Sequence, residues 1–334
     1  MAELRVLTRN LYLGASLDPI IAAPDVGHIP RAVAEAWARI AASMYVERAA
    51  AIAAEIAAHT PHLVGLQEVW DFTVTSARHA AEAAPPARAD YLALLLAELS
   101  RCGVEYTVAS AIPGPEFTVP SATGHLIHAY DRDVILSRGD VTVLENGGAR
   151  YRSAAVVRPG GEGGQAMPAN RAWARARVLV NDLPVWIVST HLETPHFRDT
   201  QLNQAVELAE LTGGMEGALV AVGDFNSGPG DPHLAPYERL LAAGLADAWE
   251  AARPGEPGPT CGQAEDLRNP ESRLSARIDL VLTRSEGQPC IHIDRTGHEP
   301  SCRTPSGLWP SDHAGLVAAL DLDILATSHT APKR

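Results

Sequence analysis

Several short polar segments of this chain follow apolar runs that are typical of buried strands. They are Thr8-Arg9-Asn10-Leu11, Gln67-Glu68-Val69, Ser189-Thr190-His191-Leu192-Glu193, Gly223-Asp224-Phe225-Asn226 and Ser311-Asp312-His313. A further acid, Asp279, lies inside the apolar strand candidate Arg277-Ile278-Asp279-Leu280. Carboxylate and amide oxygens are the ligands that Mg²⁺ prefers. A histidine beside a carboxylate is suited to proton transfer near neutral pH.

Each of these segments also has an ordinary structural explanation. The stretch Asp224-Phe225-Asn226-Ser227-Gly228 could be only a turn, because Asp, Asn, Ser and Gly all favour turns. Asp279 could pair with an arginine, and His191 could be a core histidine bonded to the backbone. A glutamate after a strand, such as Glu68, is usually a solvated or salt-bridged surface group. The combination of segments, rather than any one of them, therefore indicates function.

The elements that must position these residues form a pattern of many strands and few helices. Strands are expected over residues 4–11, 63–69, 104–109, 133–136, 219–222, 278–282 and 315–320. A hairpin is expected from residues 172–180 and 185–192, turning at Asn181-Asp182. Helices are expected over residues 31–59, 91–102 and 200–211, and residues 159–164 are an expected loop. The first helix is Ala-rich and should stop at Thr60-Pro61, because the residue before a proline avoids the helical region.

Composition limits the class of protein. The chain has 334 residues, of which 46% are hydrophobic and 20% charged, as in a globular protein. Its net charge of −13 disfavours an extended electrostatic grip on DNA or RNA. No apolar run approaches the ~20 residues that a membrane helix needs. The first residues, Met1-Ala2-Glu3-Leu4-Arg5, do not read as a signal peptide, so a cytoplasmic location is expected unless a leader has been removed.

The cysteines are too few for a disulfide scaffold in a chain of this length. Two of them share one segment with two histidines: Cys290, His292, His298 and Cys302. A zinc site and a Cys290–Cys302 disulfide are both open interpretations. The spacing fits no standard zinc finger, so unpaired residues in a surface loop are favoured.

Taken together and in this order, the polar segments resemble those of the endonuclease/exonuclease/phosphatase superfamily. That group includes deoxyribonuclease I, abasic-site endonucleases, inositol polyphosphate phosphatases and bacterial sphingomyelinases. The resemblance runs from Asn10 to His313. It implies an α/β (α+β) fold, namely a four-layer α/β/β/α sandwich of two mixed β-sheets flanked by helices. It also implies a single domain over residues 1–325, with residues 326–334 as a disordered tail.

The resemblance implies a metal site for a divalent cation. Asn10 and Glu68 match the metal-binding pair of the family, and Asp312 matches an acid near the metal. An acid that several members carry two residues after the asparagine is replaced here by Tyr12, which is a poor Mg²⁺ ligand. The expected cofactor is Mg²⁺, with Mn²⁺ as the alternative, and the number of ions is left open.

The resemblance also implies catalytic roles. His191 matches the phosphate-contacting histidine of the nuclease and sphingomyelinase branches. Asp224 and Asn226 match the pair that positions or deprotonates the attacking water. His313 matches the catalytic histidine and Asp279 the carboxylate that orients it. A carboxylate that accepts from one imidazole nitrogen fixes the tautomer and raises the basicity of the other nitrogen.

The expected activity is hydrolysis of a phosphodiester by metal-assisted in-line attack of water. The alternatives are a DNA or RNA endonuclease, a lipid phosphodiesterase of the sphingomyelinase or phospholipase C type, and a non-enzymatic scaffold of the same fold. A nuclease needs a basic stripe, which the sequence does not show, and a lipid enzyme needs exposed apolar or aromatic loops. Trp309 is either a packing residue or an aromatic wall of the substrate pocket. We expect a monomer that acts on a small or lipid-like phosphodiester.

Overall fold

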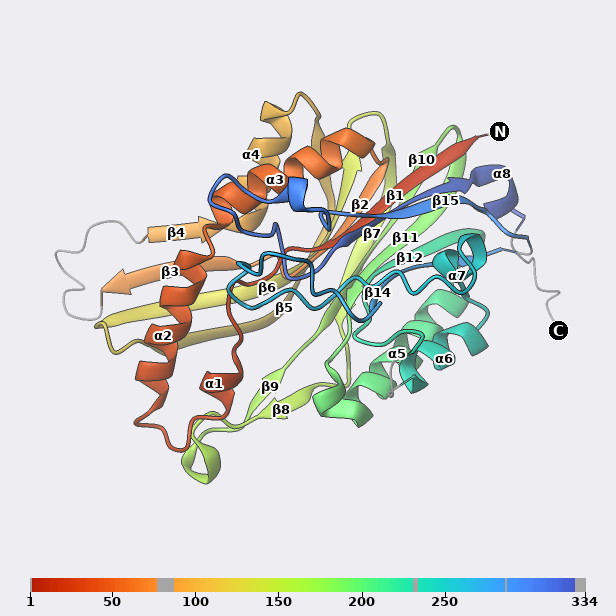
Figure 1. Cartoon of the computed structure of the whole chain (residues 1–334). Helices are drawn as coiled ribbons and strands as arrows, with labels where there is room; N and C mark the ends of the chain where they lie inside the picture. Colours follow the sequence, from red (N-terminus) through yellow and green to blue (C-terminus); the bar gives the residue numbers. More distant parts are fainter. Residues whose placement is uncertain (1, 77–86, 231–233, 286, 328–334) are drawn as a thin grey trace.

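The computed structural model describes residues 2–76, 87–230, 234–285 and 287–327. Two large mixed sheets face each other, and helices cover their outer sides (Figure 1). The first sheet contains, in spatial order, β15 (Cys290–Thr296), β16 (Gly315–Asp321), β1 (Glu3–Asn10), β2 (Leu63–Gln67), β6 (His125–Arg138), β3 (Asp71–Ser76) and β4 (Ala87–Asp90). In addition, β5 (Tyr106–Pro120) pairs with β6. The predicted arrangement of two mixed sheets flanked by helices is confirmed.

The second sheet carries the predicted hairpin at its centre. Its order is β13 (Ala246–Asp247), β14 (Asp279–Arg284), β12 (Ala218–Asp224), β11 (Leu183–His191), β10 (Ala172–Val180) and β7 (Thr142–Arg150). Asn181 and Asp182 connect β10 to β11 with φ of 49° and 62°, the left-handed conformation that short hairpin turns require. A small third sheet pairs β8 (Ala155–Val157) with β9 (Met167–Ala169).

The inner faces of the two large sheets form one apolar core. Val6 and Ile135 of the first sheet lie in the same cluster as Ile187 and Val220 of the second. Gly65 of β2 makes the close approach possible, since a Cβ at this position would lie 2.4 Å from Val222 Cγ2. Aligned β-sheets pack about 10 Å apart through such interdigitated side chains.

Helices complete the outer layers. Those on the first sheet are α1 (Asp18–Ile21), α2 (Ile29–Ala42), α3 (Tyr45–His59) and α4 (Tyr91–Arg101). Those packed mainly with the second are α5 (Arg198–Gly213), α6 (Ala235–Ala242) and α7 (Ala248–Ala252), while α8 (Leu322–Leu325) follows β16. The short 3₁₀ turns are η1 (Gly161–Gly163), η2 (Pro195–Phe197) and η3 (Pro300–Cys302).

The single long helix expected over residues 31–59 is wrong. The chain forms α2 and α3 instead, and it breaks at Met44, which has the left-handed φ of 47°. The break places the buried Arg48 of α3 where its guanidinium donates to the carbonyl oxygens of Leu11, Tyr12 and Pro310. Alanine propensity alone would continue the helix, but these tertiary hydrogen bonds override it.

Two other expectations change in extent. The strand predicted at 104–109 overlaps the start of β5 at residue 106, and the strand predicted at 133–136 is part of β6; β5 and β6 form one long pair. Cys290 begins a strand rather than lying in a loop, and all four cysteines are free thiols. Residues 328–334 of the expected tail lie outside the described residues. Among the described helices, none is both long and apolar enough to cross a membrane.

Candidate active site

The predicted site residues converge at one edge of the sandwich. Asn10 ends β1, and Glu68 directly follows β2, which runs parallel to β1. In the second sheet His191 and Asp224 end the parallel strands β11 and β12 and are partners in register. Asp279 begins β14 opposite Asp224. The carboxyl ends of parallel strands thus place polar side chains of both sheets beside one another.

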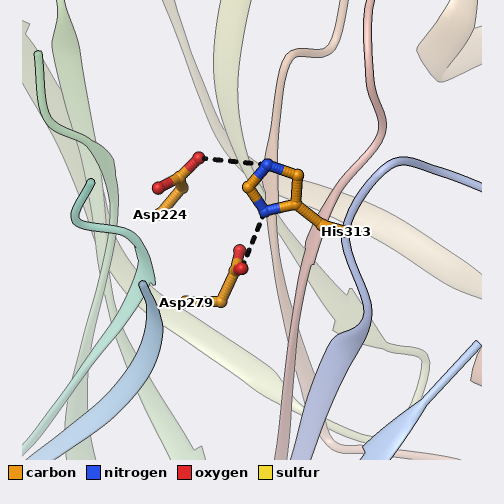
Figure 2. Close-up of side chains that lie close together, drawn as sticks. All are labelled: Asp224, Asp279 and His313. Atoms are coloured by element: carbon orange, nitrogen blue, oxygen red, sulfur yellow. Dashed lines mark hydrogen bonds and ion pairs between the residues drawn. The ribbon is translucent and has the colours of Figure 1, made fainter. Parts of the chain in front are cut away.

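A short hydrogen bond joins the predicted histidine and its carboxylate. His313 Nδ1 lies 2.7 Å from Asp279 Oδ2, although the two residues come from different parts of the chain (Figure 2). Burial lowers the pKa of His313, but the carboxylates around it, with Asp279 contributing most, raise this pKa well above its usual value. These carboxylates therefore favour the protonated form of His313, whose other nitrogen, Nε2, lies 3.8 Å from Asp224 Oδ2.

Asp224 is the centre of the cluster. Its Oδ2 accepts from Asn10 Nδ2 at 3.1 Å and lies 3.4 Å from His191 Nε2. Its Oδ1 accepts from the backbone N–H of Asn226 at 2.9 Å. Burial raises the pKa of Asp224 to about 7. A carboxylate with a pKa near neutrality can both accept and release a proton at working pH.

Gly223 and Asn226 shape the turn that presents Asp224. Gly223 has φ of +151°, and a Cβ there would lie 2.0 Å from the Thr190 carbonyl oxygen. Asn226 has the left-handed φ of 48°, and its side-chain Nδ2 donates to the Leu192 carbonyl oxygen at 2.9 Å. Asn226 thus holds the Asp224 carboxylate with its backbone, while its amide fixes the turn.

Arg171 determines the tautomer of His191. Arg171 Nη1 lies 3.0 Å from His191 Nδ1, and arginine can only donate. His191 Nδ1 must accept, so the ring proton sits on Nε2 and points at Asp224. Burial and the nearby Arg171 charge lower the pKa of His191 well below its usual value, so the ring is neutral. Arg171 is held in turn by a salt bridge to Glu193 at 3.4 Å.

The donor set suits a divalent cation. Asn10 Nδ2 lies 3.2 Å from Glu68 Oε1, so both side chains are within reach of one ion. Glu68 Oε2 accepts from the backbone N–H of Leu13 at 2.7 Å, and Asn10 Oδ1 accepts from that of Tyr12 at 2.9 Å. Rotating the Asn10 amide would present its oxygen to the ion.

Asp312 supplies a further carboxylate beside this pair. Burial raises the pKa of Asp312 to about 6, and repulsion from Glu68 adds to that rise. Mg²⁺ or Mn²⁺ would neutralise the repulsion between such oxygen donors. Asp224, Asp279 and His313 also offer ligand atoms within 4.8 Å of one another. The 2.7 Å hydrogen bond between Asp279 and His313 fits the predicted dyad better.

Trp309 lies apart from the cluster. Its side chain is fully buried, and its indole N–H donates to the Asn269 carbonyl oxygen at 2.9 Å. It packs with Tyr12, Leu267 and Leu308. Burial of the whole ring gives Trp309 the packing role, the first of the two interpretations open from the sequence, and leaves no face to contact a substrate.

Two residues of the site were not identified as site residues from the sequence. Arg171 directly precedes β10, and Glu193 follows His191 by two residues, but no spacing rule marks either as an orienting group. Their proximity arises from pairing of β10 with β11. A cleft of about 740 Å³ opens beside the cluster, and Glu68, Arg171 and Asp312 form part of its wall.

Comparison with known proteins agrees with this geometry. Residues 44–313 match the model of the Endonuclease/Exonuclease/phosphatase family. The fold is similar to an endonuclease/exonuclease/phosphatase of Bacteroides vulgatus, with a TM-score of 0.58, 17% identity, and 96% of this chain and 100% of that chain covered. It is also similar to a humanized TDP2 of D. rerio, with a TM-score of 0.57, 16% identity, and 95% and 98% covered. A search of curated proteins gave no match. The extent of the family match shows that this chain belongs to the endonuclease/exonuclease/phosphatase family.

Proposed function

We propose that this protein hydrolyses a phosphodiester and depends on Mg²⁺ or Mn²⁺. Members of its family are hydrolases of phosphoester bonds. The observation that carries the proposal is the arrangement of His313 between Asp279 and Asp224, beside the oxygen donors Asn10 and Glu68. A non-enzymatic scaffold would have no use for a buried histidine flanked by these acids.

Each side chain has a defined part in the proposed reaction. Asp279 holds His313 so that Nε2–H can donate to a non-bridging phosphate oxygen. His191, neutral and protonated on Nε2, donates to another phosphate oxygen. Asp224 orients the attacking water and accepts its proton, which its pKa of about 7 allows. No serine or cysteine nucleophile is needed.

The metal would be held by Asn10 and Glu68, with Asp312 directly or through water. A bound divalent cation neutralises phosphate oxygens and stabilises the leaving oxygen. In the proposed mechanism Asn226 holds Asp224 in place through its backbone N–H. We also propose, from the sequence, a monomeric cytoplasmic protein of one domain over residues 1–325.

A screen of purified protein tests the proposal. Bis-p-nitrophenyl phosphate, sphingomyelin, inositol phosphates, plasmid DNA and RNA are each incubated with Mg²⁺, Mn²⁺ or EDTA. We expect metal-dependent turnover of at least one phosphodiester and none in EDTA. DNA belongs in the screen because D. rerio TDP2 has been solved with a single-strand DNA product. Absence of turnover on every phosphodiester would contradict the proposal.

A further inference from the structure

We propose that the cleft beside the catalytic cluster binds a long hydrocarbon substituent of the phosphodiester substrate. That a phosphodiester occupies the site rests on the proposed function, whereas binding of a hydrocarbon chain in the cleft can be measured without any reaction. Its volume of about 740 Å³ lies within the range of ~300–1,000 Å³ that small-molecule sites occupy.

The wall of the cleft is built from apolar side chains of separate segments. Leu17 and Ile20 come from the segment that follows β1, and Phe117 comes from β5. Met167 of β9 and Phe197 of η2 contribute further apolar surface. All five are partly exposed rather than sealed in the core. Apolar side chains that converge on a hollow from several elements indicate a binding surface more strongly than scattered ones do.

The charges in the cleft exclude a second phosphate group. Among the described residues that line it, Arg171 is the single Arg or Lys. That guanidinium already contacts His191 at 3.0 Å and Glu193 at 3.4 Å. The wall carries several acids instead, including Asp18 and Glu116. A nucleotide chain would bring its next phosphate against these carboxylates, whereas a hydrocarbon chain would bring no charge.

The cleft is continuous with the proposed metal site. Glu68 and Asp312 both line it, and both belong to the catalytic cluster. A phosphate held there would therefore direct one of its ester groups into the cleft. The other ester oxygen would leave toward solvent.

Binding of methyl n-alkyl phosphates of increasing chain length tests the cleft without any turnover. Dissociation constants are measured by isothermal titration calorimetry, from the methyl to the decyl ester. Each methylene that enters an apolar site strengthens binding about fourfold. We expect a stepwise gain of this size until the cleft is full, and weaker binding of a thymidine oligonucleotide than of the octyl ester. Dissociation constants that do not change with chain length, or tighter oligonucleotide binding, would overturn the proposal.

Substitution of cleft-lining residues tests hydrocarbon binding independently of hydrolysis. The double variant Leu17→Asn/Ile20→Asn should lose most of the gain per methylene, measured as the octyl-to-methyl ratio of dissociation constants. Leu144→Ser is the matched control, because Leu144 is 47% exposed on β7 and does not line the cleft. An unchanged ratio in the double variant would contradict the proposal. If binding depends on chain length but no p-nitrophenyl alkyl phosphate is hydrolysed, the proposed function would be contradicted and the proposed hydrocarbon-binding cleft would stand.

Discussion

At the scale of single residues, Asp279 combines two properties that a purely structural acid would not need. Its Oδ2 accepts from His313, while its Oδ1 is buried without a hydrogen-bond partner among the described residues. An unpartnered buried carboxylate oxygen costs folding free energy. A carboxylate in this state beside a histidine is consistent with a role in the reaction rather than in stability.

Asp279→Asn should therefore reduce rate far more than stability. The substitution keeps the shape of the side chain but removes the charge that holds the His313 tautomer. We expect kcat to fall roughly 10²–10⁴-fold, while the free energy of unfolding falls only by the amount that the raised pKa of His313 contributes. Turnover of bis-p-nitrophenyl phosphate and urea unfolding, measured on the same preparation, check this. Parallel losses of activity and stability would favour a structural ion pair.

The protonation of His313 gives a second prediction, for metal-free protein. Because the pKa of His313 is raised well above its usual value of about 6.5, the folded state binds this proton more tightly than the unfolded state. The resulting stabilisation is complete below about pH 6.5 and is lost as the pH rises through the folded pKa. NMR titration should show a raised pKa that Asp279→Asn lowers. A pKa near 6.5 in both proteins would contradict the assignment.

At the scale of elements, α3 fixes the loop that carries His313. Arg9 of β1 is fully buried, donates to the His313 carbonyl oxygen and lies 3.2 Å from Glu55 of α3. Glu55 is also buried, and this burial raises its pKa despite the Arg9 charge. The pair therefore links a helix of the outer layer to the catalytic edge.

Glu55→Ala should destabilise the protein by about 3–5 kcal/mol, because it leaves the Arg9 guanidinium buried and unpaired. Glu55→Gln should cost less, since its amide oxygen can still accept from Arg9. Glu35→Ala is the control: Glu35 forms an exposed pair with Arg31, and such pairs contribute about 0.3–0.5 kcal/mol. Urea unfolding checks all three. Equal effects of Glu55→Ala and Glu35→Ala would show that the buried pair has no special role.

The sequence predicted best what depends on local pattern. Asp224, His191 and Glu68 were expected at strand ends and lie there, and turn chemistry located the hairpin turn at Asn181-Asp182. The prediction was wrong where distant contacts decide. At Met44 the chain leaves the helix that its alanines would continue, and the hydrogen bonds of the buried Arg48 hold this break. The role of Trp309 also depended on three-dimensional burial. The order of strands, which brings Asp279 to His313, entered only through resemblance to a family.

At the scale of the whole molecule, the net charge of −13 and the acidic cleft argue against a long polyanion as the main substrate. A duplex-binding enzyme that contacts many phosphates loses ~10³-fold or more in affinity between about 50 and 200 mM salt. Here a single phosphate would be engaged at a time. We predict a shallow salt dependence of kcat/KM on a small phosphodiester. Cleavage of DNA that is faster than that of the small phosphodiester and falls steeply with salt would contradict this prediction and favour a nuclease.

The most direct test of the central claim is a Mg²⁺ and Mn²⁺ titration of phosphodiester turnover in the unmodified protein and in Glu68→Ala. Calorimetric metal binding is measured on both proteins, and Glu35→Ala is the control. We predict no turnover in EDTA, recovery with metal, and loss of both activity and metal affinity in Glu68→Ala because the main anionic ligand is gone. Full turnover in EDTA, or near-full turnover of Glu68→Ala at saturating metal, would contradict it.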